Sequence, residues 1–321
     1  MSIDESAAGP TSGLSKGPVH TIVPKPAIEC RNLSFSHGNT QVLNDITFSL
    51  PPGSRCVLVG ANGAGKSTLL RILGGRHMHD DTAAFILGHN AFRATSFLNH
   101  RRQYLDPNWG LRTVAFAGCG VAYQADIPVG EMMQKLQEEF PQRRDELLRM
   151  LEIDPEWRMH KLSDGQRRRV QLFLGLIRPF RVILLDEVTA VLDVLCRQRL
   201  LEYLRRECDE RKCTMIYATH VFDGLDAWST HILWLRKTPI PGSVGFFDET
   251  RRAPGLAGLS CSNLSLLPTV MTWLTGERAR SSGQHNAAVG AYDPSKEVED
   301  EAGDAAIQDK SSCLLYTSPS P

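Results

Sequence analysis

The sequence has no excess of charge of either sign, because its 321 residues contain 36 Lys and Arg against 36 Asp and Glu. Proteins that bind nucleic acid without regard to sequence normally carry a strongly basic surface. The balanced charge therefore gives no indication of direct nucleic-acid binding. With 42% hydrophobic residues, a chain of this length can still bury a sizeable core.

The sequence also lacks long apolar runs and paired cysteines. No run approaches the roughly 18 residues that a membrane-spanning helix needs, so we expect no transmembrane segment. The eight cysteines form no CxxC pair and follow no secretory leader, which favours free thiols over disulfides or a zinc site. We therefore expect a cytoplasmic protein, with the nucleus as a second compartment that fits.

Changes in composition divide the chain into four parts. Residues 1–26 are rich in Ser, Gly and Pro and predict a disordered lead. Residues 27–245 alternate strand and helix patterns and predict one globular domain. We expect one helix in a C-terminal extension, 246–276, and a disordered tail over 277–321. The last residues of that tail, 313–321, resemble a translated sequencing adapter, and a genuine flexible end is the alternative.

The fold class follows from the strand patterns of the central part, which lie at 27–37, 41–53, 54–60, 181–187 and 213–220. The first two segments alternate apolar and polar residues, like neighbouring strands of a half-buried antiparallel sheet. The other three are separated by helical patterns, which indicates a parallel sheet covered on both faces by helices. A stretch at about 90–178 predicts an inserted, mainly helical region. The expected fold class is therefore α/β.

A glycine-rich segment, GANGAGKST, lies between the apolar strand at 54–60 and a helical pattern. It matches G-x-x-x-x-G-K-S/T, the pattern of a loop that binds nucleotide phosphates. Backbone N–H groups and the helix N-terminus bind phosphate oxygens in such a loop, Lys66 meets the β- and γ-phosphates, and Ser67 ligates Mg2+. The candidate ligands are Gly60, Ala61, Asn62, Gly63, Ala64, Gly65, Lys66, Ser67 and Thr68. The loop alone does not separate kinases, GTPases and ATPases, and a glycine-rich turn is the alternative.

The apolar strand VILLDE ends in two carboxylates, Asp186 and Glu187. Ligands bind at the carboxyl ends of the strands in open parallel sheets. At that edge Asp186 can hold Mg2+ through water, and Glu187 can orient the water that attacks the γ-phosphate. Helix capping or solvent exposure is the alternative for both. His220 ends another strand, and only that position favours a functional over a structural histidine.

The order of these motifs resembles that of the ATP-binding-cassette (ABC) ATPases over roughly residues 28–240. The segment LSDGQ is similar to the family's signature LSGGQ, VLD ending at Asp193 matches its D-loop, and ATH ending at His220 matches its switch histidine. The resemblance implies an ABC-type P-loop NTPase with a RecA-like parallel sheet core, an antiparallel β-subdomain and an inserted helical subdomain. It also implies an Mg-dependent ATP hydrolase that uses ATP and Mg2+.

The resemblance also assigns roles to individual residues. The catalytic residues would be Lys66, Gln124, Glu187 and His220. The ligands of Mg2+ would be Ser67, Gln124 and Asp186. Nucleotide contacts beyond the phosphate loop would come from His37, Ser163, Gly165, Gln166 and Asp193. A solvated glutamine is the alternative for Gln124, and His37 would stack on adenine less well than a larger ring.

Two longer stretches, LEIDPEWRMHKLSDGQRRRVQL and YATHVFDGLDAW, look like a small eukaryotic subfamily of soluble ABC ATPases. That subfamily includes the fungal factor associated with the Ccr-Not complex and the plant non-intrinsic ABC proteins. The resemblance implies an ATP-sandwiched homodimer or paralogue heterodimer that regulates a protein assembly such as Ccr-Not. The ATP-binding subunit of a multi-chain transporter is the alternative. An inactive scaffold is disfavoured because Lys66 and Glu187 are both present.

Two departures from the family pattern bear on the mechanism. Ser163 and Gln166 form an S-x-x-Q capping box, which predicts a helix that starts at Asp164. At that position the Asp164 charge favours the helix but repels phosphate. Val188 stands where the family usually has proline, which removes a fixed φ beside the catalytic loop without removing a catalytic atom.

Overall fold

The computed structural model describes residues 25–107, 113–116, 119–122, 126–236, 244–248 and 266–281. Residues 1–24 and 282–321, which hold most of the predicted lead and tail, lie outside these ranges. The chain divides into two compact units, 1–277 and 278–321, and the first contains every element except the end of the last helix. No helix within the described ranges is long and apolar enough to cross a membrane.

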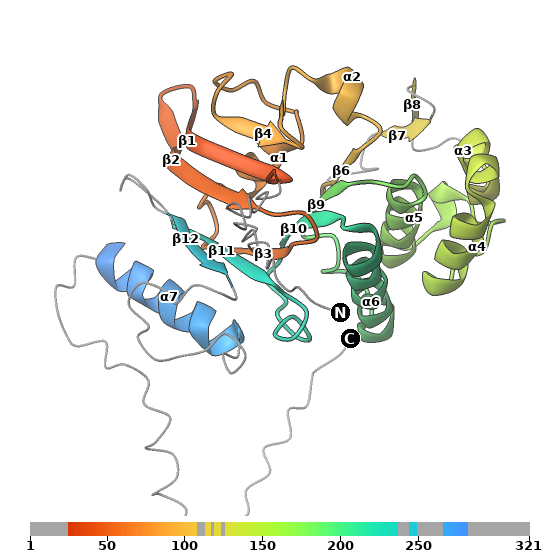
Figure 1. Cartoon of the computed structure of the whole chain (residues 1–321). Helices are drawn as coiled ribbons and strands as arrows, with labels where there is room; N and C mark the ends of the chain where they lie inside the picture. The colour runs from red at the N-terminus through yellow and green to blue at the C-terminus, as the bar shows by residue number, and fades with distance from the viewer. Residues whose placement is uncertain are drawn as a thin grey trace, which may run out of the picture. The chain divides into compact units, whose positions relative to one another are not determined.

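An antiparallel sheet of four strands, in the order β2-β1-β4-β5, forms the N-terminal part (Figure 1). Its strands are β1 (Ile28–His37), β2 (Thr40–Leu50), β4 (Ala84–Ile86) and β5 (His89–Asn90). Along β1, Ile28, Cys30 and Leu33 are buried, whereas most residues between and after them are exposed or half-buried. The alternating sequence pattern therefore places one face of this sheet on the core, as predicted.

A six-stranded sheet forms the centre of the first unit, in the order β12-β11-β3-β10-β9-β6. Its strands are β3 (Arg55–Val59), β6 (Arg102–Leu105), β9 (Val182–Asp186), β10 (Thr214–Ala218), β11 (His231–Leu235) and β12 (Val244–Asp248). Neighbouring strands are parallel, except for β11 and β12. Every residue of β3, β9 and β10 is buried, as their apolar sequences predict.

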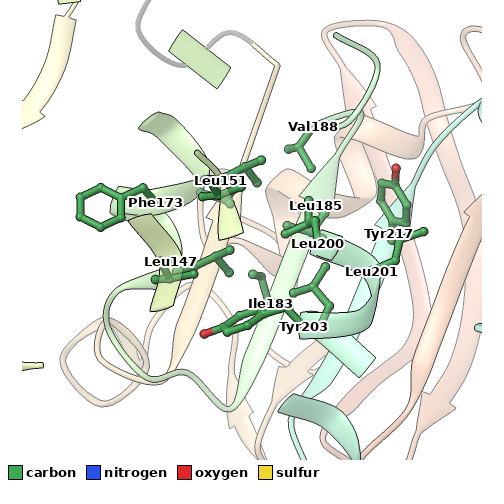
Figure 2. Close-up of a cluster of buried hydrophobic side chains, with 14 of the residues drawn as sticks. Leu147, Leu151, Phe173, Ile183, Leu185, Val188, Leu200, Leu201, Tyr203 and Tyr217 are labelled. Carbon is green, nitrogen blue, oxygen red and sulfur yellow. The ribbon is translucent and has the colours of Figure 1, made fainter. Parts of the chain in front are cut away.

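Helices cover both faces of the central sheet, which confirms the expected α/β class. On one face, α1 (Lys66–Leu73) shares a core with the antiparallel sheet; on the other lie α5 (Asp164–Leu176) and α6 (Val194–Arg211). Each face of the sheet therefore has its own hydrophobic core, the first under α1 and the second under α5 and α6. Successive residues of β3 alternate between them, with Leu58 in the first core and Val59 in the second. Figure 2 shows part of the second core, around β9 and α6.

The stretch between β5 and β9 contains α5 and five shorter helical elements, which are α2 (Thr95–Leu98), η1 (Val129–Glu131), α3 (Gln134–Glu139), α4 (Pro141–Met150) and η2 (Met159–Lys161). It also contains β6, which pairs with β9, and a hairpin of β7 (Thr113–Phe116) and β8 (Cys119–Ala122). Near the C-terminus, α7 (Leu266–Ser281) begins in the extension where one helix is expected and runs past residue 276 into the predicted tail, and its Trp273 stacks on Trp234 of β11 at 4.8 Å.

Candidate active site

The phosphate loop joins the carboxyl end of β3 to the N-terminus of α1. Gly65 has a φ of 98°, and a Cβ there would lie 2.7 Å from Cδ2 of Leu43. A Cβ on Gly60 would lie 2.4 Å from the carbonyl oxygen of Leu235. Both positions therefore require glycine, because a Cβ fits at neither. At Gly65 the positive φ is a second reason. In the rest of the loop Ala64 and Thr68 are buried, Ala61 and Ser67 are half-buried, and Asn62 and Gly63 are exposed.

The side chain of Lys66 turns back across this loop. Its Nζ atom donates to the carbonyl oxygens of Gly60, at 2.7 Å, and Ala61, at 3.1 Å, and the residue is only 7% exposed. The N-cap residue of α1, Gly65, has no side chain that could accept from the first N–H groups of the helix. An ammonium group and a helix N-terminus on one loop suit the oxygens of a phosphate.

Asp186 lies at the carboxyl end of β9 and is only 1% exposed. Its Oδ2 atom is buried and has no hydrogen-bond partner among the described residues. Burial raises the pKa of Asp186, and a hydrogen bond from the Ser67 hydroxyl acts in the opposite direction. An unsatisfied carboxylate oxygen beside a hydroxyl offers the hard oxygen ligands that Mg2+ prefers, so the residues fit this ion. Bound there, Mg2+ would neutralise phosphate charge.

Glu187 follows β9 and His220 follows β10, and their side chains meet at the same edge of the sheet. Oε1 of Glu187 lies 2.9 Å from Nε2 of His220, and the side chains are 37% and 44% exposed. The Glu187 N–H donates to the carbonyl oxygen of Ala218 at 2.9 Å, which ties the loop after β9 to β10. A carboxylate open to water and oriented by a second polar side chain can accept a proton from an attacking water molecule.

The signature segment forms the start of α5 as predicted. The Gln166 N–H donates to Oγ of Ser163 at 3.3 Å, and the Ser163 N–H donates to Oε1 of Gln166 at 3.0 Å. Asp164 is exposed and pairs with Arg167 at 2.5 Å. A Cβ on Gly165 would meet the carbonyl oxygen of Val191 at 3.2 Å. The glycine of the signature therefore lies against the D-loop of the same chain.

The carboxylate of Asp193, in the D-loop, accepts two hydrogen bonds. Its Oδ1 atom accepts from the Cys196 N–H at 2.8 Å, which caps α6. Its Oδ2 atom accepts from Nη2 of Arg169 at 2.6 Å, and Arg169 also donates to Glu152 at 3.2 Å. The bond to the Cys196 N–H and, to a smaller extent, the Arg169 guanidinium hold the pKa of Asp193 below its usual value. A nucleotide contact by Asp193 stays a prediction beside these structural roles.

The adenine and Q-loop predictions remain open. His37 ends β1 and contacts the rings of Phe35 and His77, with centroids 5.0 and 5.3 Å away. The neighbouring strand β2 lies against the phosphate loop, since a Cβ on Gly65 would lie 3.2 Å from Cγ1 of Val42. His37 therefore belongs to the hairpin that borders the loop. Gln124 lies outside the described residues, so its role stays a prediction.

Sequence reasoning missed Asp106, which directly follows β6. Leu105 pairs with Leu185 in the parallel β6–β9 ladder, so Asp106 comes beside Asp186 at the sheet edge. The negative charge of Asp106 contributes to the raised pKa of Asp186. Its backbone carbonyl accepts from Arg168 of α5 at 3.1 Å. Nothing in the sequence marks this position, because a four-residue strand with polar members gives no clear pattern.

Comparison with known proteins identifies the family. The model of the family described as "ABC transporter" matches residues 43–190. ABC transporter I family member 20 of Arabidopsis thaliana is 46% identical over 242 residues, which are 75% of this chain and 71% of that protein. CCR4-associated factor 16 of Saccharomyces cerevisiae is 40% identical over 228 residues, 68% of this chain and 79% of that protein.

Solved structures share the fold at lower identity. An ATP-binding subunit of an ABC transporter has a TM-score of 0.60 at 22% identity, over 78% of this chain and 99% of that one. The post-hydrolysis dimer of the ATP-binding cassette MJ0796 has a TM-score of 0.55 at 19% identity, over 72% of this chain and 100% of that one. From the sequence relatives and the phosphate-loop geometry together, we conclude that this chain belongs to the ABC family of ATPases and binds and hydrolyses ATP.

Proposed function

We propose that this protein works as an ATP-dependent dimer, in which two copies, or one copy and a paralogue, hold two ATP molecules between them. The observation that carries the proposal is that the signature helix α5 and the D-loop lie against each other and form one surface. An ion pair between Arg169 and Asp193 holds them together. On and beside that surface Val191, Val194 and Leu195 are 49%, 72% and 63% exposed. A second copy would cover these apolar side chains. The dimeric MJ0796 cassette, of the same fold, supports the arrangement.

Each ATP would be held by two sets of residues. The phosphate loop of one copy would bind the phosphates, Ser67 and Asp186 would hold Mg2+, and Gln124 would be a further ligand of the metal ion and of the water. Glu187 accepts the proton of the attacking water, and His220 fixes the Glu187 carboxylate and the γ-phosphate. The contacts from the opposite copy are Ser163, Gly165, Gln166 and Asp193. His37 lies against adenine.

Exchange of the base for an amide tests this assignment. Glu187→Gln keeps the shape of the side chain but cannot accept a proton, so we expect hydrolysis to fall by about 100-fold or more while ATP binding is retained. The matched control is Glu202→Gln, on an exposed position of α6, which should leave both unchanged. Phosphate release measures the rate of hydrolysis, and calorimetry measures ATP binding. Hydrolysis at the wild-type rate by Glu187→Gln would contradict the assignment.

We further propose that the dimer regulates a protein assembly such as the Ccr-Not complex, in the cytoplasm or the nucleus. The 40% identity to a yeast protein named CCR4-associated factor 16 supports this role. The alternative, an ATP-binding subunit of a multi-chain transporter, draws support from a sulfate/thiosulfate import protein of Cucumis sativus, which is 31% identical over 204 residues. Of these two relatives the yeast factor is the more similar, which favours the regulatory role over a transporter subunit of that kind.

Affinity purification with the Glu187→Gln protein in the presence of ATP separates the two roles. We expect recovery of Ccr-Not subunits in stoichiometric amount, because the ATP-bound state persists when hydrolysis is blocked. Stoichiometric recovery of polytopic membrane proteins instead would overturn the regulatory role. Lys66→Ala, which removes the ammonium group from the phosphate loop, is the control and should lose the partners that depend on ATP.

A further inference from the structure

Strand β10 carries a buried tyrosine, Tyr217, beneath the two loops that hold Glu187 and His220. Tyr217 is 1% exposed, and its hydroxyl is hydrogen-bonded to the hydroxyl of Thr189, two residues after Glu187. Burial raises the pKa of Tyr217, while hydrogen bonds with the hydroxyls of Thr189 and Thr219 act in the opposite direction. Thr219 directly precedes His220. The phenol oxygen therefore joins β10, the strand that leads into the loop with His220, to the loop that carries Glu187.

The loop after β9 needs such support because its conformation is unusual. Glu187 has a φ of 49°, which is uncommon for a residue other than glycine and persists only when the surroundings fix it. The next residue is Val188, whose φ is free to vary where a proline would hold it. Val188 is buried in the second core, and Figure 2 shows it at the same end of that core as Tyr217.

We propose that Tyr217 is a positioning residue for ATP hydrolysis. By bonding to Thr189 it fixes the loop that carries Glu187 and ties that loop to β10, which ends two residues before His220. The link keeps Oε1 of Glu187 and Nε2 of His220 at the observed 2.9 Å. Tyr217 touches neither ATP nor water itself. This role rests on the proposed function of Glu187 as the base.

A purely structural role for the phenol is the competing explanation, because any buried hydroxyl needs a hydrogen-bond partner. The ring of Tyr217 also packs edge-on against Trp228, with centroids 6.3 Å apart. Tyr217→Phe retains the ring and that contact and removes only the oxygen. A structural role predicts an effect on thermal unfolding alone, whereas a positioning role predicts an effect on kcat at temperatures well below unfolding.

The test compares kinetics of Tyr217→Phe with those of two other variants. We expect kcat to fall roughly tenfold or more, with unchanged affinity for a non-hydrolysable ATP analogue, since only the geometry of the base is disturbed. Thr189→Val should cause a similar loss, and the double variant should be no worse than either alone. Tyr203→Phe is the matched control: Tyr203 is 4% exposed, its hydroxyl has no hydrogen-bond partner among the described residues, and kcat should not change.

A second comparison uses the variant without the base. In the Glu187→Gln background, Tyr217→Phe should leave the residual rate unchanged, because no base remains to be positioned. A wild-type kcat for Tyr217→Phe, or an equal loss in both backgrounds, would overturn the proposal. Wild-type hydrolysis by Glu187→Gln alone would instead contradict the proposed function, so the two failures are distinguishable.

Discussion

At the scale of single residues, the buried carboxylate of Asp186 is costly to the unliganded protein. Burial raises the pKa of this carboxyl above its unfolded value. Folding therefore binds a proton in the window between the two pKa values, and stability falls as pH rises through that window. Above it the full cost of a buried, incompletely bonded charge is present. This loss of stability is the expected cost of keeping a proposed ligand of Mg2+ buried and only partly hydrogen-bonded.

Replacement of Asp186 by asparagine should stabilise the unliganded protein. We expect Asp186→Asn to raise Tm at neutral pH by roughly 2–4 °C and to flatten the decline of Tm with rising pH, since the titrating charge is gone. The same variant should lose the additional stabilisation that Mg2+ gives with ATP. Scanning calorimetry at several pH values measures both, with the exposed Glu202→Gln as control. A lower Tm for Asp186→Asn would contradict the account.

The signature residue Asp164 brings a negative charge to a helix N-terminus that is proposed to face phosphate. Its side chain is 84% exposed and pairs with Arg167, so that the charge is offset only in part. We expect Asp164→Gly to tighten the ATP-bound dimer, measured as its Kd by sedimentation in the Glu187→Gln background. Asp164→Asn separates the charge from backbone flexibility. An unchanged or weaker dimer with Asp164→Gly would refute this.

At the scale of elements, one buried ion pair connects three helices. Arg143 of α4 donates to both carboxylate oxygens of Glu207 of α6, at 2.8 and 3.0 Å, and to the carbonyl oxygen of Leu176 of α5 at 2.7 Å. The two charged side chains are only 10% and 7% exposed. Removal of Arg143 would leave the buried Glu207 charge with only the longer contact to Arg211 at 3.8 Å, and removal of Glu207 would leave the Arg143 charge buried.

The ion pair between Arg143 and Glu207 predicts that substitutions of its two residues have non-additive effects on the free energy of unfolding. Arg143→Met should lower the free energy of unfolding by about 3–5 kcal/mol, whereas adding Glu207→Met should recover part of that loss. Arg144→Met, which removes an exposed partner of Asp145, should cost less than about 1 kcal/mol. Urea denaturation measures all three. Additive losses in the double variant would show that the pair does not act as a unit.

Elements with a local sequence pattern could be predicted from the sequence. Elements that are stabilised by contacts with distant parts of the chain could not. Strands β3, β9 and β10 each contain an apolar run of four residues, and the capping box marks the start of α5, so the sequence shows both kinds of signal. Strand β6 begins with Arg102, which is buried because its Nη1 atom donates to the carbonyl oxygens of Leu73 and Ala91. No pattern in the sequence reveals that these carbonyls satisfy a buried guanidinium. Strand β11 was also not predicted, although four of its five residues are apolar.

At the scale of the whole molecule, strand order determines how much of the site the sequence can reveal. The motif residues, such as Glu187 and His220, are recognisable one by one, and the structure brings these two together. Asp106 and Tyr217 are not recognisable, because their importance depends on the order β3-β10-β9-β6, which is not the order along the chain. Residues that act through neighbouring strands become visible only once those strands are placed side by side.

The measurement that tests the central claim most directly is light scattering of the Glu187→Gln protein. With ATP and Mg2+ the account predicts a mass twice the 35.6 kDa of the single chain, and the single-chain mass without nucleotide. Lys66→Ala should keep the single-chain mass under both conditions. A Glu187→Gln protein that binds ATP yet retains the mass of one chain would contradict the pairing of two copies of this chain and leave only a paralogue as the second subunit.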